Sequence, residues 1–440
     1  MHKATDRREN PEGSWEYAVT LLERWQTKDE RVDVLLDSLP AELAPAQRAR
    51  VQALLLGAVR HLGRIDRHLN RLIARPPREW VWAALVVAGF ELLEVPDSAK
   101  KEGYAARVCH HAVEKIKCLA SPPESRLANA VLRKLAAAMA TETAPGEGEP
   151  VNAWASYYSH PEWLIERWIH QFGAGEAHRF VEWNQRIAPI IVRWRNPAVS
   201  PTKDELTWLK PIDDSRQFFS VEPGHWPDVL ARLSSGVLVV QDTATRDSVE
   251  LLNPQPHETV LDLCAAPGGK SLAIADRMGS GRVVSVDLPS PRLDRLLENL
   301  QRAPKGVKTS MVRADLLQNC GQRLEQQGLP RTYDAVLVDV PCSNTGVMRH
   351  RVDVKWRIQL DDFREHALQQ LAMLQAAADR VAAGGRLVYS TCSVDPEENQ
   401  HVVNAFVRRS RGAFKLVDSC LSLPWESGHD GAGAFLLKRT

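Results

Sequence analysis

The sequence predicts a multi-domain protein with an all-α domain at the N-terminus, a small α+β module in the middle and a doubly wound α/β domain at the C-terminus. Two observations carry the prediction. In the first 140 residues, apolar positions recur every three or four residues, and no convincing strand interrupts them. From residue 251 onward, short apolar runs alternate with helical patterns, which is typical of a mostly parallel sheet. The length of 440 residues also favours several domains over one.

The predicted all-α domain covers residues 14–140. Its apolar positions follow helical spacing, as at Leu54, Leu55 and Val59, and prolines separate one helix from the next. The stretch TETAPGEGEP comes next, and its Pro and Gly content predicts a linker over residues 141–152.

The middle of the chain, residues 153–245, has a mixed pattern. Helical stretches such as HPEWLIERWIHQF give way to short strand-like runs such as PIIVRW and GVLVVQD. This mixture predicts a small α+β module.

The predicted α/β domain covers residues 246–440. Its strand-like runs are TVLDLC, RVVSVDL, KTSMVRADL, YDAVLVDVP and GGRLVYSTC, separated by helical patterns. Open parallel sheets carry their chemistry at the carboxyl ends of the strands. The residues that follow these runs are therefore the candidates for a functional site.

A loop of small residues, CAAPGGKS, follows the first of these strands. Ala265, Ala266, Gly268 and Gly269 allow the backbone to approach a ligand closely, and the start of the next helix offers free N–H groups. A phosphate-binding P-loop is excluded because Cys264 stands where that motif needs its first glycine.

Acidic residues end the next two strands. Asp287 suits the ribose hydroxyls of a nucleoside cofactor, and Asp315 is placed to receive an adenine amino group. For each residue, the alternative role is capping a helix. Together with the small-residue loop, these acids favour S-adenosylmethionine over a dinucleotide.

Two cysteines, Cys342 in VDVPCSNTG and Cys392 in YSTCSVDPEEN, each follow a strand-like run. Burial as structural cysteines and pairing as a disulfide are the alternatives, but seven cysteines without regular spacing fit a reducing compartment. The pair indicates covalent catalysis on a cytosine: a thiolate adds to C6, which makes C5 nucleophilic toward a sulfonium methyl group. Asp339, which precedes Cys342 at the strand end, is a candidate for holding the pyrimidine edge or the cofactor.

These stretches resemble the RsmB/NOP family of RNA 5-cytosine methyltransferases, and most closely its RsmB branch, which acts on 16S rRNA. The matching stretches are QDTATRDSVELLNPQPHETVLDLCAAPGGKS, VDVPCSNTGVMRHRVDVKW and GGRLVYSTCSVDPEENQHVV. LLLGAVRHLGRIDRHL and HHAVEKIKCLASPPESRLANAVLRKL resemble the NusB-like RNA-binding domain that RsmB enzymes carry. The resemblance implies a NusB-like N-terminal domain and a Rossmann-like methyltransferase domain.

The resemblance also implies roles for single residues. Cys392 would attack C6, Cys342 would assist product release, and Lys270 would lie near both cofactor and base. The residues implied to bind S-adenosylmethionine are Cys264, Ala265, Ala266, Pro267, Gly268, Gly269, Lys270, Asp287, Asp315 and Asp339.

The chain departs from the family pattern at three places. Asn344 replaces the first Gly of Pro-Cys-Ser-Gly-Thr-Gly, Val352 replaces the Pro of a His-Pro-Asp motif read here as Arg-Val-Asp, and the tail lacks the usual aromatics. Asn tolerates a left-handed backbone better than most residues, so we expect Asn344 to preserve the loop.

An arginine series predicts where RNA binds. Arg60, Arg64, Arg67, Arg71 and Arg75 are spaced to form one stripe on a helix, and the alternative is a solvated helix face. Since the net charge is only +1, affinity for RNA must come from such local patches.

Two further sets of residues are candidates for RNA contact. Arg126 and Arg133 are candidates for extending the arginine surface. Core packing explains most tryptophans of the middle module, and one or two are candidates for stacking on an unpaired base. These are Trp154, Trp163, Trp168, Trp183, Trp194 and Trp208.

The predicted enzyme is an RNA (cytosine-5)-methyltransferase that uses S-adenosylmethionine, with small-subunit rRNA as substrate and tRNA as the alternative. The competing classes are an amino-methyltransferase, which needs no thiol, and a non-catalytic RNA-binding factor. The polar start MHKATDRREN and the short apolar runs predict a cytoplasmic protein without a membrane segment. No Cys/His cluster has zinc spacing, and nothing in the sequence demands more than a monomer.

Overall fold

The computed structural model describes residues 13–94 and 103–440, so the polar start of the chain lies outside the described residues. The chain forms two compact units. The first ends at Arg186 and also includes Met348–Arg357, and the second comprises Ile187–Val347 and Ile358–Thr440. The residues predicted as one module at 153–245 fall in both units: those up to Arg186, which are helical, belong to the first unit, and those from Ile187 on, which include the strands, belong to the second.

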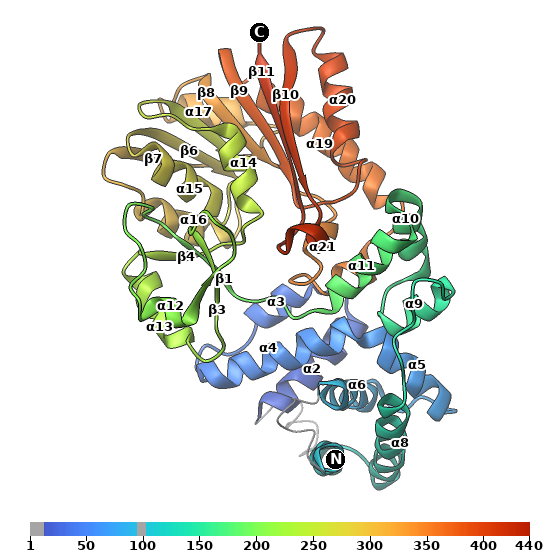
Figure 1. Ribbon diagram of the computed structural model, residues 1–440. Coiled ribbons are helices and arrows are strands. Elements are labelled where there is room, and N and C mark those ends of the chain that lie inside the picture. Colours follow the sequence, from blue (N-terminus) through green and yellow to red (C-terminus); the bar gives the residue numbers. More distant parts are fainter. Residues whose placement is uncertain (1–12, 95–102) are drawn as a thin grey trace. The chain divides into compact units, whose positions relative to one another are not determined.

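The first unit is helical, as predicted (Figure 1). Its helices are α2 (Ser14–Thr27), α3 (Val32–Asp37), α4 (Pro45–Arg60), α5 (Leu62–Leu72), α6 (Glu79–Leu93), α7 (Tyr104–Leu119), α8 (Pro122–Ala140), α9 (Val151–Tyr157), α10 (Glu162–Phe172), α11 (Ala174–Gln185) and α18 (Val354–Arg357). Helix α6 is apolar nearly all round and packs against α2, α4, α7 and α8, as expected of a central buried helix. Helix α8 starts with a capping box in which the side chains of Ser121 and Glu124 satisfy free N–H groups.

The segment Met348–Arg357 provides side-chain donors to the C-terminal end of α4 within the first unit. The Nζ atom of Lys355 donates to the carbonyl of Arg60 at 2.8 Å, and the indole N–H of Trp356 donates to the carbonyl of Val59 at 3.0 Å. Both carbonyls lie in the last turn of α4, where C=O groups lack the regular partners of a helix interior. Val352, one of the departures from the family pattern, is 1% exposed and belongs to the apolar core of this unit.

The second unit contains a small antiparallel sheet with strand order β2-β3-β1-β4. Its elements are β1 (Ile191–Trp194), α12 (Glu205–Trp208), β2 (Leu209–Pro211), β3 (Phe218–Val221), α13 (Trp226–Ser234) and β4 (Leu238–Val240). Trp194 and Trp208 lie in its core. Trp154, Trp168 and Trp183 are buried in the first unit, so core packing accounts for five of the six tryptophans, and Trp163 is half-buried.

The larger sheet of the second unit has strand order β10-β11-β9-β8-β5-β6-β7 (Figure 1). Its strands are β5 (Thr259–Leu263), β6 (Gly281–Asp287), β7 (Val307–Arg313), β8 (Tyr333–Asp339), β9 (Val381–Thr391), β10 (Phe414–Ser422) and β11 (Ala432–Arg439). Strands β5 to β9 are parallel, which confirms the predicted α/β domain, while β10 and β11 are antiparallel. Because β8 lies between β5 and β9, the loops after these three strands meet at one edge of the sheet.

Helices cover both faces of this sheet. The helices are α14 (Thr245–Leu252), α15 (Gly269–Met278), α16 (Arg292–Gln301), α17 (Cys320–Gln326), α19 (Asp362–Ala378), α20 (Gln400–Arg409) and α21 (Pro424–Ser427). Side chains of α14 and α15 pack on one face, and those of α17, α19 and α20 pack on the other. None of the helices in the described part of the chain has the length and apolar character needed to cross a membrane.

Candidate active site

The loop between β5 and α15 needs a glycine at position 268. Gly268 adopts φ +97°, and a Cβ atom there would lie 2.8 Å from Cδ1 of Leu296, so only glycine fits. Burial raises the pKa of the neighbouring Cys264 thiol well above its ordinary value, and its side chain packs against the sheet core. Cys264 is therefore a packed, uncharged member of the loop.

Asp287 faces this loop from the end of β6. Its Oδ2 atom accepts the backbone N–H of Ala266 at 2.7 Å, and its Oδ1 atom accepts that of Leu288 at 2.6 Å. Helix α16 begins only at Arg292, so Asp287 is not its cap. The carboxylate is thus fixed by two backbone N–H groups at the end of β6, beside the β5–α15 loop.

Asp315, after β7, is engaged in a local turn. Its Oδ1 atom accepts the N–H of Leu317 at 2.8 Å, and its carbonyl accepts the N–H of Cys320, where α17 begins. The Asp315 carboxylate therefore holds a turn before α17 and does not cap this helix, whose N-cap residue is Asn319.

Asp262 belongs to the same region, although the sequence analysis did not single it out. It lies on β5, is fully buried, and its Oδ2 atom accepts the hydroxyl of Ser271 at 2.5 Å. Burial raises the pKa of Asp262 to about 7, and the charge of Asp339 acts in the same direction. An acid inside the apolar run TVLDLC was the signal that could have found it.

An ion pair joins the start of α15 to the end of β8. The Nζ atom of Lys270 lies 2.7 Å from Oδ2 of Asp339, whose Oδ1 atom accepts the hydroxyl of Ser390 at 2.7 Å. Burial alone would lower the pKa of Lys270, but the charge and the hydrogen bond of Asp339, followed by an electrostatic interaction with Cys392, raise it above its ordinary value. Lys270 is thus an ammonium that interacts with both the Asp339 carboxylate and Cys392.

The two predicted cysteines meet at the ends of the adjacent strands β8 and β9. The Sγ atoms of Cys342 and Cys392 are 3.1 Å apart and hydrogen-bonded, and both residues are free thiols. The hydrogen bond to Cys392, together with burial, raises the pKa of Cys342 well above its ordinary value. Cys342 therefore keeps its proton and is the natural donor toward Cys392, which is more exposed.

Asn344 contacts both cysteines. It adopts φ +62°, which confirms the expectation that asparagine fits this position of the loop. Its Nδ2 atom donates to the carbonyl of Cys342 at 2.7 Å, and its Oδ1 atom accepts the thiol of Cys392 at 3.3 Å. The replacement of glycine at this position therefore adds a polar side chain beside the thiols.

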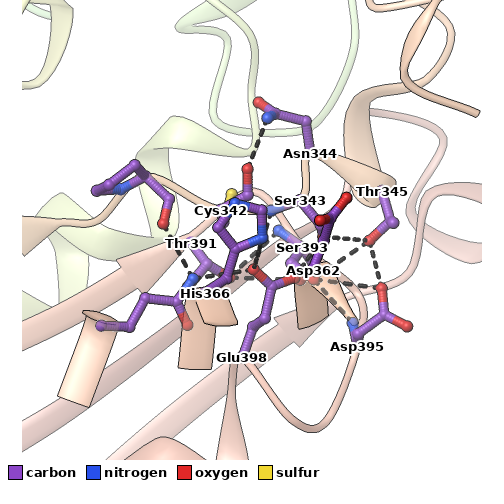
Figure 2. Close-up of polar contacts among 12 residues, drawn as sticks. Cys342, Ser343, Asn344, Thr345, Asp362, His366, Thr391, Ser393, Asp395 and Glu398 are labelled. Carbon is purple, nitrogen blue, oxygen red and sulfur yellow. Dashed lines mark hydrogen bonds and ion pairs between the residues drawn. The ribbon is translucent and has the colours of Figure 1, made fainter. Parts of the chain in front are cut away.

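A buried polar network links the two cysteine loops (Figure 2). The hydroxyl of Thr345 donates to Oδ2 of Asp395 at 2.6 Å, and the N–H of Gly346 donates to the carbonyl of Cys392 at 3.0 Å. A Cβ atom at Gly346 would lie 2.8 Å from that carbonyl oxygen, so the loops are in direct backbone contact. The sequence carries no local signal for this network, because hydroxyl and carboxyl side chains are common in loops.

Comparisons with known proteins identify the family to which this chain belongs. A family model described as 16S rRNA methyltransferase RsmB/F matches residues 249–425, and a NusB family model matches residues 14–137. Ribosomal RNA small subunit methyltransferase B of Shigella boydii serotype 18 is 31% identical over 416 residues, covering 90% of each chain. The chain belongs to the RsmB/F methyltransferase family. It is an S-adenosylmethionine-dependent RNA methyltransferase with a NusB domain at its N-terminus.

Other relatives and solved structures agree with this assignment. The methyltransferase B of Salmonella paratyphi B is 30% identical over 444 residues, covering 96% of this chain and 97% of the relative. The crystal structure of PH0851 has the same fold, with a TM-score of 0.73 at 22% identity over 97% of this chain and 98% of that one. NSun6 from Pyrococcus horikoshii, solved with SFG, has a TM-score of 0.53 at 18% identity and covers 63% of this chain and 98% of its own.

The NusB domain of this RsmB/F enzyme does not present the predicted arginine stripe. Helix α4 ends at Arg60 and α5 begins at Leu62, so the series does not lie on one helix, and Arg75 follows the end of α5. Arg60 is 5% exposed and donates to the carbonyl of Arg349 at 3.0 Å. The spacing of the arginines gives one stripe only on an unbroken helix, so this prediction is wrong.

The remaining arginines of the series have different surroundings. Arg64 donates to Glu142 at 2.7 Å and lies over the ring of Tyr157, and Arg67 pairs with the same glutamate. Arg71 and Arg75 are exposed. Only these two of the five predicted arginines therefore remain candidates for free phosphate contacts.

A groove between α7 and α8 adds basic groups to the NusB domain. Its volume is about 870 Å³, and its rim combines exposed cationic side chains with an apolar floor. The polar groups that line it are His110, Glu114, Lys117, Ser125, Arg126, Asn129 and Arg133. Glu114 is paired with Lys117, so the groove has a positive excess at Arg126 and Arg133.

Proposed function

We propose that the protein methylates C5 of a cytosine in 16S rRNA through a covalent bond between Sγ of Cys392 and C6 of the base. The observation that carries the proposal is the pair of free thiols 3.1 Å apart, beside the Lys270–Asp339 ion pair. The relatives named ribosomal RNA small subunit methyltransferase B support the choice of rRNA, and tRNA is the alternative substrate.

The residues around the β5–α15 loop fit S-adenosylmethionine. Helix α15 begins at Gly269 and offers N–H groups there, and the Asp287 carboxylate, fixed by two backbone N–H groups, suits ribose hydroxyls. When bound, the cofactor supplies an electrophilic methyl group. Asp315 would contact the adenine only with the part of its carboxylate that its local turn leaves free.

The protein then has to provide a reactive thiolate at Cys392. The ammonium of Lys270 interacts favourably with a negative charge on Cys392, and the Cys342 thiol donates a hydrogen bond to it. Both effects stabilise the thiolate that adds to C6. Addition moves electron density to C5, which is the position that accepts the methyl group.

Release reverses the addition. A water molecule acting as base takes the proton from C5, the C5–H electron pair re-forms the C5=C6 double bond, and the C6–Sγ bond breaks with its electron pair returning to Sγ of Cys392. Because the pKa of Cys342 is raised, its thiol is protonated and stabilises the departing thiolate with a hydrogen bond. Asp339 lies beside this pair, where it can accept from the cytosine N4 amino group or contact the cofactor.

Trapping the covalent intermediate tests the proposal. Cys342→Ala protein is incubated with S-adenosylmethionine and small-subunit rRNA and analysed on a denaturing gel. We expect a protein–RNA adduct that disappears when Cys392 is also replaced by alanine. Methylation that survives Cys392→Ala would rule out the covalent scheme, and methyl label on N4 would establish an amino-methyltransferase instead.

We also propose that the NusB domain contacts RNA phosphates through Arg71, Arg75 and the rim of the α7–α8 groove. This assignment is supported by the exposure of these arginines and by the positive excess at Arg126 and Arg133. A cytoplasmic, monomeric enzyme is the form expected for this activity.

A further inference from the structure

We infer that Gln370 and Glu398 are positioning residues that hold Cys342 in place for the release of the methylated base. The inference rests on the proposed function and goes beyond it, because neither side chain touches the thiols. Gln370 comes from α19, and Glu398 comes from the loop between β9 and α20. Both are fully buried.

The pair holds the peptide groups on both sides of Cys342. The Nε2 atom of Gln370 donates to the carbonyl of Pro341 at 3.0 Å. The Oε1 atom of Glu398 accepts the backbone N–H of Ser343 at 2.9 Å, and Oε2 accepts the hydroxyl of the same serine (Figure 2). The backbone before and after the cysteine is therefore fixed by two side chains from elements outside its own loop.

The two positioning residues also hold each other. Nε2 of Gln370 donates to Oε1 of Glu398 at 2.9 Å, and the hydroxyl of Tyr389 donates to the carbonyl of Glu398 at 2.5 Å. Tyr389 lies on β9, the strand that leads to Cys392. The Cys342 loop is thus fixed relative to the strand that carries the partner cysteine.

The acceptor role of Glu398 explains why a carboxylate is buried here. One of its oxygens accepts two N–H donors, from Ser343 and Gln370, and the basic group beside it is His366, whose Nδ1 atom is 3.6 Å away. A buried acceptor that satisfies several donors keeps a single geometry. Since the thiol contact is 3.1 Å long, a shift of about 1 Å in the Cys342 backbone is enough to lose it.

Three variants test the inference. Gln370→Leu removes the donor to Pro341, and Glu398→Leu removes the acceptor for Ser343. Glu398→Gln removes the charge but keeps an acceptor oxygen for the Ser343 and Gln370 N–H groups, and its new NH2 group can donate to the Ser343 hydroxyl. Gln369→Leu is the matched control, because Gln369 is the exposed neighbour of Gln370 on α19.

The rates of adduct formation and of release are measured separately, in single-turnover reactions with S-adenosylmethionine and small-subunit rRNA. We expect both leucine variants to lose less in the rate of adduct formation, which Lys270 still supports, than in the rate of product release, which should fall at least about tenfold. Glu398→Gln and Gln369→Leu should release normally. In the Cys342→Ala background, Gln370→Leu should slow release no further, because the positioned group is already absent.

Wild-type release rates in both leucine variants would overturn the inference. An equal fall in the rates of adduct formation and of release would also overturn it, because it indicates general structural damage. If Glu398→Leu fails to fold, Gln370→Leu and the Glu398→Gln rescue still decide the question. An adduct with Cys342→Ala but none with the leucine variants refutes this inference alone. Absence of an adduct with Cys342→Ala refutes the proposed function itself.

Discussion

The Nζ atom of Lys270 lies 2.7 Å from Oδ2 of Asp339, and this ion pair connects the start of α15 with the strand that leads to Cys342. The same ammonium interacts electrostatically with Cys392. Lys270 therefore interacts with both Asp339 at the end of β8 and Cys392 after β9.

Replacing Lys270 with methionine should lower the rate of methyl transfer by about 100-fold, because the charge that stabilises both Asp339 and the thiolate is lost. Lys270→Arg keeps the charge and should lose less. Initial rates with radiolabelled S-adenosylmethionine give the comparison, and a thermal melt confirms that both variants are folded. A Lys270→Met enzyme with wild-type activity would contradict the role given to this ion pair.

Gly268→Ala should weaken S-adenosylmethionine binding and lower the free energy of unfolding by about 2–3 kcal/mol. The left-handed backbone costs roughly 1–2 kcal/mol, and the new Cβ atom would meet Leu296 at 2.8 Å. Gly384→Ala is the matched control, because Gly384 also has a positive φ, +72°, but nothing within 4 Å of the added atom. Calorimetric titration and denaturant unfolding measure the two effects, and equal losses in both variants would exclude the close approach as a cause.

The stability of the wild type relative to Asp262→Asn should depend on pH. Burial raises the pKa of Asp262 from 3.8 to about 7, so the folded protein retains a proton that the unfolded chain releases. The resulting stabilisation is complete below about pH 4 and is lost as the pH rises through about 7, by up to about 1.4 kcal/mol per pH unit. Urea unfolding of both proteins from pH 4 to 8 measures it. A difference that stays constant with pH would show that the carboxyl does not titrate in this range.

Asn344→Gly should fold as stably as the wild type to within about 1 kcal/mol, whereas Asn344→Val should lose about 1–3 kcal/mol. The reason is the left-handed φ of +62°, which glycine accepts and a β-branched residue resists. Denaturant unfolding compares the three proteins. The methylation rate of the glycine variant then shows how much the contacts of the Asn344 side chain with Cys342 and Cys392 contribute to catalysis.

Replacing Arg126 and Arg133 together with glutamine should reduce the salt dependence of RNA binding. Each lost phosphate contact lowers the slope of log K against log salt by about 0.7–0.9. The control removes the same charge from Arg408 and Arg409, which are exposed on α20 in the other unit. Filter binding at several salt concentrations gives the slopes, and equal slopes for both double variants would exclude the groove as a binding surface.

Much of the fold was accessible from the sequence, because its signals are local. The alternation of apolar runs with helical patterns predicted the parallel strands, and β5 and β8 appear where TVLDLC and YDAVLVDVP stand. The meeting of Cys342 and Cys392 also depends on β8 and β9 being neighbours in the sheet. Spacing along the chain does not state strand order, so only their shared position at strand ends was predictable.

What the sequence did not predict depends on contacts between distant segments. Spacing placed Arg60 on an exposed stripe, but α4 stops at His61, which stacks on Phe90, and the arginine turns inward to Arg349. The pairing of Gln370 with Glu398 was equally invisible, because neither residue stands out in its own segment.

The segment Met348–Arg357 has a consequence for how this protein can be divided. The chain leaves the first unit after Arg186, returns to it at Met348 and leaves again after Arg357, so no single cut separates the units. A shortened protein that begins after Arg186 would contain Val352 and Lys355 without the helices that bury them. Recombination at one linker could therefore not exchange the NusB domain of this enzyme for another, and the two units are expected to be inherited together.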